Sequence, residues 1–219
     1  MRDAYFDELE TIVRDLVTMT HEVQQAVARA TRALLTADAE IAERVISDDA
    51  DIDAARERIE HKSFELLALQ QPVARDLRML VAALRMVADL ERMGDLSVHV
   101  AKVARLRVPL VAVPDELVPT VQRMAAVAEK MVGTVAGVIA ERDVEGARRM
   151  EQDDEEMDRL RRSSFRLMLD DSWPYGVEAA VDIALLGRYY ERIADHAVSL
   201  ARRVVYLVTG ERVGAPLAG

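Results

Sequence analysis

The chain has 219 residues, a formal net charge of −10, a hydrophobic share of 51% and no cysteine. The negative charge argues against a nucleic-acid partner, because phosphate backbones are bound by concentrated basic faces. The lack of cysteine excludes disulfides, zinc fingers, iron–sulfur clusters and cysteine nucleophiles. Neither a basic and apolar leader nor an apolar run of membrane-spanning length is apparent, so we expect a cytoplasmic protein without direct membrane insertion.

Helical periodicity dominates the first half and predicts three long helices. In the first helix, apolar residues recur at steps of three and four positions until Thr36. Asp38 is the expected N-cap of the second helix, which runs to about Gln70. Pro72 then marks the start of a third helix, because proline is tolerated in the first helical turn, and that helix runs to about Leu106.

The second half repeats this order of three helices. The fourth helix is expected to open at Asp115 and to end near Glu141. The fifth runs to about Asp170. A cap-and-proline start at residues 171–174 then introduces the sixth, which continues to about Thr209. No strand or hairpin pattern occurs in the chain.

Two prolines in residues 108–114 break any helix and mark the connector between the halves. We therefore expect an all-α fold of two tandem three-helix bundles, residues 1–107 and 115–209, related by an internal pseudo-repeat. Residues 210–219 are expected to form a loose tail. A single extended coiled coil is the alternative fold, and the proline breaks oppose it.

A charged motif recurs at half-chain spacing, once in the third helix and once in the sixth. Glu91 and Asp95 are repeated 100 positions later by Glu191 and Asp195. Each pair lies at positions i and i+4, so both carboxylates share one helix face. Like charges at this spacing repel by roughly 0.2–0.5 kcal/mol unless a cation lies between them. A metal ion or an arginine can be that cation.

The second and fifth helices carry further pairs with the same spacing. These pairs are Asp49/Asp53 and Asp154/Asp158. Chance matches are expected in a chain with 39 acidic residues, and Glu178/Asp182 is one of them. The informative feature is therefore the matched placement, with one pair on the second helix and one on the third helix of each half.

In the sixth helix the carboxylates lie away from the apolar stripe that faces the core. That stripe consists of Ile183, Leu186, Tyr190, Ile193, Ala197, Leu200, Val204 and Leu207. Glu191 lies about 200° from Ile193 of this stripe, at ~100° per residue. The face that carries it is either a solvated surface neutralised by Arg188 and Arg192 or a metal-binding surface.

All-oxygen ligation suits hard cations such as Mg²⁺, Mn²⁺, Ca²⁺ or Fe³⁺. His99 lies on the face of Asp95 and could add a ligand, whereas His196 projects away from Asp195. The absence of a Glu-x-x-His motif argues against a di-iron centre of the usual kind. No glycine-rich phosphate loop and no nucleophile elbow occur, so direct phosphate sensing finds no support in the sequence.

Taken together, four stretches of the chain resemble the PhoU family of phosphate-signalling regulators, in a form typical of actinobacteria. They are residues 48–53, 69–78, 89–95 and 190–197. The resemblance implies two three-helix bundles and a homodimer. It also implies a cytoplasmic, non-enzymatic negative regulator of the phosphate-starvation response. Such a protein acts between the ATPase of the phosphate transporter and a membrane sensor histidine kinase.

The resemblance further implies multinuclear iron or zinc clusters on the bundle surface and no organic cofactor. By position, the expected metal ligands are Asp49, Asp53, Glu91, Asp95, Asp154, Asp158, Glu191 and Asp195. The halves differ where Leu96-Ser97 stands opposite His196-Ala197, so we expect the two surfaces to differ in occupancy. A carboxylate-metal enzyme and a plain helical scaffold without metal are the alternative functions.

Overall fold

The computed structural model describes residues 2–210, with side chains described for residues 5–150 and 155–210. The described chain contains six long helices, one 3₁₀ turn and no strand. These elements are α1 (Arg2–Thr36), α2 (Ala39–Gln70), α3 (Ala74–Arg107), η1 (Asp115–Leu117), α4 (Val118–Glu141), α5 (Val144–Met168) and α6 (Gly176–Thr209). The predicted loose tail lies almost wholly outside the described residues.

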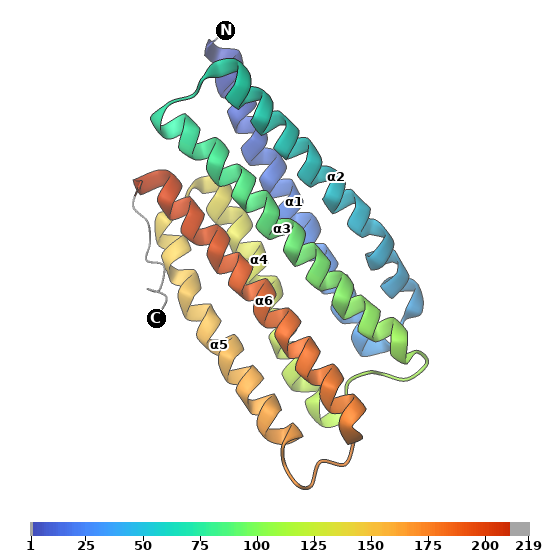
Figure 1. Ribbon diagram of the computed structural model, residues 1–219. Helices are drawn as coiled ribbons and strands as arrows, with labels where there is room; N and C mark the ends of the chain where they lie inside the picture. The colour runs from blue at the N-terminus through green and yellow to red at the C-terminus, as the bar shows by residue number, and fades with distance from the viewer. Residues whose placement is uncertain (1, 211–219) are drawn as a thin grey trace.

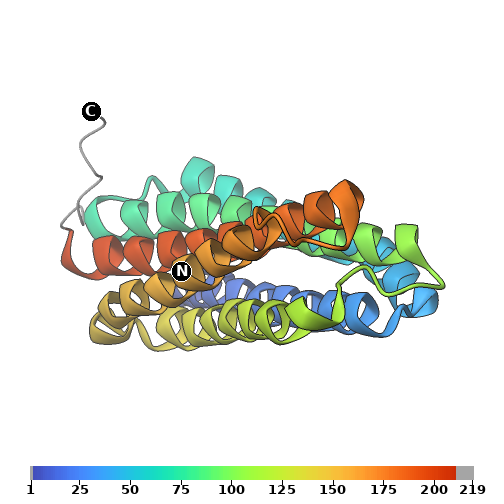
Figure 2. The same cartoon turned by 90° about the horizontal axis from the view of Figure 1, so that it is seen from below.

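Each half of the chain forms one three-helix bundle, and the two bundles lie side by side (Figure 1). Helices α1, α2 and α3 pack on one another, as do α4, α5 and α6. The bundles meet where α1 packs on α4 and α3 packs on α6. Seen from below, α3 and α6 form one layer and α1 and α4 the other (Figure 2). This arrangement confirms the predicted fold class of two tandem three-helix bundles.

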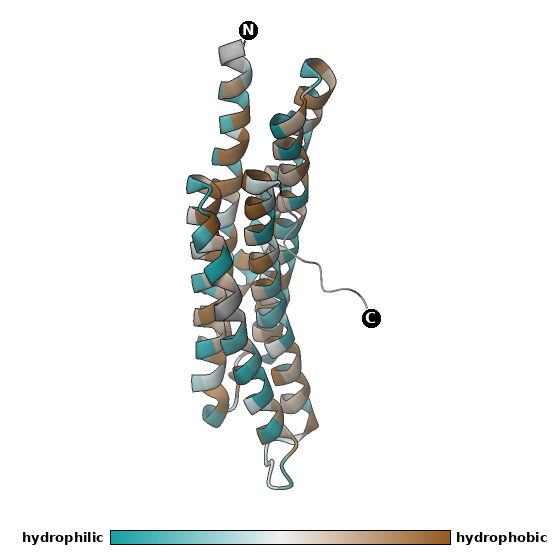
Figure 3. Ribbon diagram, turned by 90° about the vertical axis from the view of Figure 1, so that its left-hand side faces the viewer, coloured by the Kyte–Doolittle hydropathy of each residue, from teal (hydrophilic) through white to brown (hydrophobic). Residues whose placement is uncertain are grey.

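One hydrophobic core runs through both bundles. The predicted stripe of α6 is buried throughout, and Tyr190 within it has no exposed surface. The Tyr190 hydroxyl lies 2.8 Å from Oγ1 of Thr31 on α1, so a hydrogen bond crosses the interface between the bundles. The helices show both hydrophilic and hydrophobic residues around their circumference in Figure 3, as expected for amphipathic helices.

Several predicted helix ends are confirmed by their capping contacts. The Asp38 carboxylate accepts a hydrogen bond from the backbone N–H of Ile41 at 2.9 Å and caps α2. Gly210 has a left-handed backbone with φ 77° and ends α6. Such caps satisfy backbone groups that have no partner within the helix.

Three predicted helix starts differ from the structure by a few residues. α3 begins at Ala74, after an extended Val73, so proline 72 precedes the helix. Asp115 opens the 3₁₀ turn, and α4 follows at Val118. α6 begins at Gly176, because residues 170–174 form a turn in which the Asp170 carboxylate accepts from the backbone and hydroxyl of Ser172. Before α6 this side-chain contact stabilises a turn that delays the start of the helix.

A buried ion pair joins the bundles at the end of α3. Arg107 donates from Nε to Asp182 Oδ2 at 2.6 Å and also contacts Glu178, both on the first turns of α6. Asp182 is only 6% exposed. The chance carboxylate pair Glu178/Asp182 is thus neutralised by an arginine of the other bundle. Among the described residues, no helix is long and apolar enough to cross a membrane.

Candidate carboxylate metal sites

In the first half, packing of α2 on α3 brings all four predicted ligands into one cluster. Burial raises the pKa of Asp49 to about 6, and the charges of Asp95, Asp53 and Glu91 add to that rise in this order. Lys102 opposes it. The charges of the other three predicted ligands, on α2 and on α3, therefore reach Asp49.

Gly94, the residue before Asp95 in the repeated motif, permits the close approach of α2 to α3. A Cβ atom at Gly94 would lie 3.2 Å from Oδ1 of Asp49 and 3.1 Å from Cδ1 of Ile52. Any larger residue would press against α2 at this level. Gly94 therefore lets the carboxylate of Asp49 lie directly against α3.

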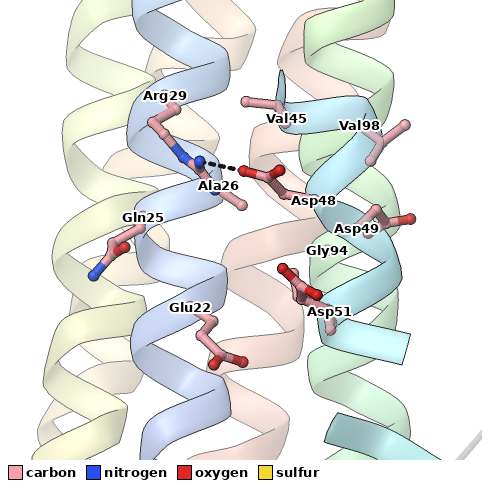
Figure 4. Close-up of a pocket in the computed structure, with 11 residues that line it drawn as sticks. Glu22, Gln25, Ala26, Arg29, Val45, Asp48, Asp49, Asp51, Gly94 and Val98 are labelled. Atoms are coloured by element: carbon pink, nitrogen blue, oxygen red, sulfur yellow. Dashed lines mark hydrogen bonds and ion pairs between the residues drawn. The ribbon is translucent and has the colours of Figure 1, made fainter. Parts of the chain in front are cut away.

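A cavity of about 240 Å³ lies beside Asp49, between α1, α2 and α3 (Figure 4). Asp48 accepts a hydrogen bond from Arg29 Nη1 at 2.6 Å, so its carboxylate is directed to α1 and away from the motif. Burial raises the pKa of Glu22 on the opposite wall, Asp51 adds to the rise and Arg58 opposes it. The cavity is acidic, but Asp49 is the one predicted ligand that borders it.

Arginine contacts the first-half cluster at its edge. Arg92 Nη1 lies 2.9 Å from Asp95, while its Nε is 3.7 Å from Glu91. Arg56 Nε lies 3.9 Å from Asp53, beyond hydrogen-bonding distance. Asp49 has no arginine partner in the described part of the chain. The cluster therefore keeps much of its negative charge.

In the second half, three of the four predicted ligands come together between α5 and α6. Burial raises the pKa of Asp195, with Glu191 the next cause and Asp158 a smaller one, while Arg188 and His196 oppose the rise. The side chain of Asp154 lies outside the described residues. The second half thus repeats the placement of the first.

The two halves differ in how the central glutamate is neutralised. Glu191 is 9% exposed and accepts from Arg161 Nη1 at 2.7 Å and from Arg188 Nη1 at 2.6 Å. Arg188 thus neutralises Glu191, as one of the two interpretations left open by the sequence supposed, but on a buried side chain and not on a solvated surface. Arg192 is exposed and makes no ion pair with Glu191 in the described region. Position 88, the counterpart of Arg188, is alanine.

Sequence reasoning missed the arginine that belongs to the repeat. Arg56 follows Asp53 by three residues, and Arg161 follows Asp158 by the same spacing. Both project from the second helix of their bundle towards its third. The signal was present as a repeated Asp-x-x-x-Asp-x-x-Arg pattern, but its meaning depends on which glutamate each arginine reaches.

The histidines are engaged away from the carboxylate pairs. His196 Nδ1 lies 3.0 Å from Oδ1 of Asp89 on α3, and Arg203 Nε donates to the other Asp89 oxygen at 2.8 Å. His99, considered as a metal ligand, stacks on Tyr189 with ring centroids 5.3 Å apart. Both contacts join α3 to α6, so these histidines hold the bundles together.

The first-half cluster fits a cation better than the second. Within the described residues, no three histidine, aspartate or glutamate side chains already converge in a metal-holding geometry. Side-chain rotation would be needed in either half. Burial is the main cause of the raised pKa of Asp49, and repulsion from Asp95, Asp53 and Glu91 adds to it. A cation between α2 and α3 would relieve that repulsion. In the second half, two arginines already supply positive charge at Glu191.

Comparison with known proteins finds solved structures with the same fold and relatives that belong to one family. The PhoU domain model matches residues 16–104 and 121–204. A phosphate-specific transport system accessory protein PhoU homolog 2 of Mycobacterium tuberculosis is 46% identical over 210 residues, covering 96% of this chain and 99% of that relative. A PhoU homolog of Rhizobium meliloti is 35% identical, covering 94% of this chain and 88% of that relative.

Solved structures agree. The crystal structure of PhoU from Pseudomonas aeruginosa superimposes with a TM-score of 0.84 at 30% identity, covering 94% of this chain and 100% of that one. The phosphate transport system regulatory protein PhoU from Streptococcus pneumoniae shares the fold, with a TM-score of 0.85 over 96% of this chain and 100% of that one. The relatives are named as accessory proteins, in line with the prediction that this chain is not an enzyme. The sequence resemblance is thereby confirmed, and the chain belongs to the PhoU family.

Proposed function

We propose that the chain is a cytoplasmic negative regulator of phosphate uptake and of phosphate-starvation signalling. It acts by protein contact between the ATPase of the phosphate transporter and a membrane sensor histidine kinase. The observation that carries this proposal is the match along nearly the whole chain to accessory proteins of the phosphate-specific transport system.

An exposed apolar surface supports action by protein contact. At the connection between α2 and α3, Leu69 is 76% exposed, Val73 74% and Leu77 41%, with Arg75 among them. Apolar side chains gathered on a surface and rimmed by charge are typical of protein–protein interfaces. This connection is also the stretch of the first half that most specifically resembles the family. We propose it as a partner-binding surface, with a homodimer as the expected state of the free protein.

A metal at the first-half carboxylates is part of the proposal. Asp49, Asp53, Glu91 and Asp95 would hold it, with iron, zinc, magnesium or manganese as candidates. The metal would supply positive charge that links α2 to α3. The second-half set, Asp154, Asp158, Glu191 and Asp195, is expected to bind more weakly, since arginines compete there.

The regulatory role is tested by deleting the gene, together with any close relative in the same genome, and measuring phosphate-responsive transcription. Loss of the protein is expected to raise that transcription in high phosphate. Leu69→Ser should reproduce the deletion at normal protein level, whereas Leu110→Ser, 73% exposed at the connector between the bundles, should not. Transcription that follows phosphate normally in the deletion strain would overturn the proposal.

A further inference from the structure

A second candidate site lies on the face formed by α2, α3 and α6. α3 lies between the other two helices in Figure 1. A groove of about 440 Å³ opens over α3 at this point. Its lining includes four arginines, Arg56, Arg85, Arg92 and Arg203. Three carboxylates line it as well, those of Glu60, Asp89 and Glu91.

The charge of this groove is opposite to that of the protein. Four arginines against three carboxylates leave one positive charge, in a chain whose formal net charge is −10. Arg203 and Asp89 offset each other, because Arg203 donates to Asp89 at 2.8 Å. The positive excess therefore comes from the remaining arginines, Arg56, Arg85 and Arg92, against Glu60 and Glu91. The lining itself therefore has a small positive excess, with Asp95 2.9 Å from Arg92 and Asp53 3.9 Å from Arg56 at its border. Arginines that line a groove attract anions.

Two of the arginines have donor groups without partners. Arg85 is exposed and makes no hydrogen bond or ion pair with any described residue. Nε of Arg56 is buried and lacks a hydrogen-bond partner, and the nearest carboxylates of Arg56 lie 3.9 Å (Asp53) and 4.0 Å (Glu57) away. A buried donor without a partner is costly, so a ligand that accepts from Arg56 would be bound favourably.

We infer that this groove binds a phosphate-type oxyanion. Arg56 and Arg85 are the principal ligands, with Arg92 and Arg203 at the edges. The planar guanidinium group donates two parallel hydrogen bonds to a tetrahedral oxyanion, which makes arginine the preferred residue for this chemistry. The sequence contains no phosphate-binding motif. The site arises only where α2, α3 and α6 meet.

The residues that line the groove also restrict the class of phosphate-containing ligand that it can bind. Among the described residues, no aromatic side chain borders the groove, so these residues offer no stacking surface for a nucleotide base. The groove has room for one orthophosphate ion and also for a somewhat larger molecule. The ligand is therefore either free orthophosphate or a small non-nucleotide molecule with more than one phosphoryl group. This inference does not depend on the regulatory role proposed above.

Isothermal titration of the full chain tests the site, with orthophosphate and pyrophosphate as separate probes and EDTA present throughout. Saturable binding of at least one probe is expected. Preference for orthophosphate would identify the free ion as the ligand, and preference for pyrophosphate a molecule with several phosphoryl groups. If neither probe shows saturable binding, the inference is overturned. Binding that appears only when added metal replaces EDTA also overturns it, because a metal held by the carboxylates near Glu91 would then bind the phosphate.

Four variants assign the binding to the groove. Arg85→Gln and Arg56→Gln should each weaken binding by about tenfold or more, as expected for loss of a charge-assisted hydrogen bond. Glu60→Gln should strengthen binding, because it removes a negative charge from the lining. Arg148→Gln, on an exposed arginine of α5, removes the same charge elsewhere and should leave binding unchanged. Equal losses in Arg148→Gln and Arg85→Gln would reveal a general charge effect and overturn the inference.

Discussion

Arg161 Nη1 lies 2.7 Å from Glu191 Oε1, and this ion pair joins α5 to α6. The equivalent arginine of the first half, Arg56, forms no ion pair with Glu91 in the described part of the chain. The repeated motif is therefore neutralised by an ion pair between α5 and α6, whereas its copy between α2 and α3 keeps an excess of negative charge. The predictions below test this difference and the contacts between the bundles.

Removal of Arg161 should destabilise the protein more than removal of Arg56. Arg161→Met leaves the nearly buried Glu191 with one arginine, so the free energy of unfolding should fall by about 1–3 kcal/mol. Arg56→Met should change it by about 0.5 kcal/mol or less, since its carboxylates lie at 3.9 Å or more. Urea unfolding followed by circular dichroism measures both. Equal losses would contradict the asymmetry.

Metal binding should depend on the first half. After equilibration with Mn²⁺ or Zn²⁺ and gel filtration, elemental analysis should find metal in the wild type and in Glu191→Gln but markedly less in Glu91→Gln. Bound metal should also stabilise the fold, by about 2.7 kcal/mol at a hundredfold excess over the dissociation constant. Metal retained in Glu91→Gln and lost in Glu191→Gln would reverse the assignment.

Asp49 should make stability depend on pH in the absence of metal. Its folded-state pKa of about 6 exceeds the ordinary value of 3.8, so the folded state binds the proton more tightly. Stability contributed by protonated Asp49 is therefore lost as pH rises from about 4 through 6. Asp49→Asn should be more stable than the wild type at pH 8 by about 1 kcal/mol, a value reduced for solvent screening.

The difference should vanish below pH 4, where both proteins carry a neutral side chain at position 49. Urea unfolding between pH 4 and 8 with EDTA present measures it. Asp171→Asn, at a surface position in the α5–α6 connection, serves as the control and should show no such trend. A gap between Asp49→Asn and the wild type that is equal at pH 4 and pH 8 would contradict the prediction.

Arg107 should be essential for the contact between the bundles. Arg107→Met leaves the carboxylate of Asp182 buried without a partner, at a cost of about 3–5 kcal/mol. Adding Asp182→Asn should recover part of this loss, because the unpaired buried charge is removed. Arg105→Met breaks only an exposed pair with Glu43 and should cost about 0.5 kcal/mol or less. Thermal unfolding of the wild type and these three variants measures the effects. A double variant that is no more stable than Arg107→Met would argue against the buried ion pair.

The sequence alone predicted the helices and their order. Apolar periodicity defines each helix, because burial of one face stabilises it wherever its neighbours lie. The Asp38 cap and the Gly210 stop are local signals and were predicted correctly. The starts of α3, α4 and α6 were misplaced by two to five residues, because local hydrogen bonds and proline geometry form turns there before the helix begins.

The duplicated carboxylate pairs were also visible in the sequence, since a spacing of four places two side chains on one helix face. Their partners were not. Whether an arginine reaches a given glutamate depends on the distance between α2 and α3 or between α5 and α6, which no single-helix pattern contains. The repeated arginines Arg56 and Arg161 lie in equivalent sequence positions yet differ in their contacts.

The order of residues was enough to predict six amphipathic helices, a repeat of three, the family and the candidate ligands. The packing of the helices established that Glu191 is neutralised while the cluster around Asp49 keeps much of its negative charge. It also brought arginines of α2, α3 and α6 to one groove. The physical reason is that helix formation and amphipathicity depend on residues a few positions apart. Ion pairing depends on distances of a few ångströms between helices far apart in the chain.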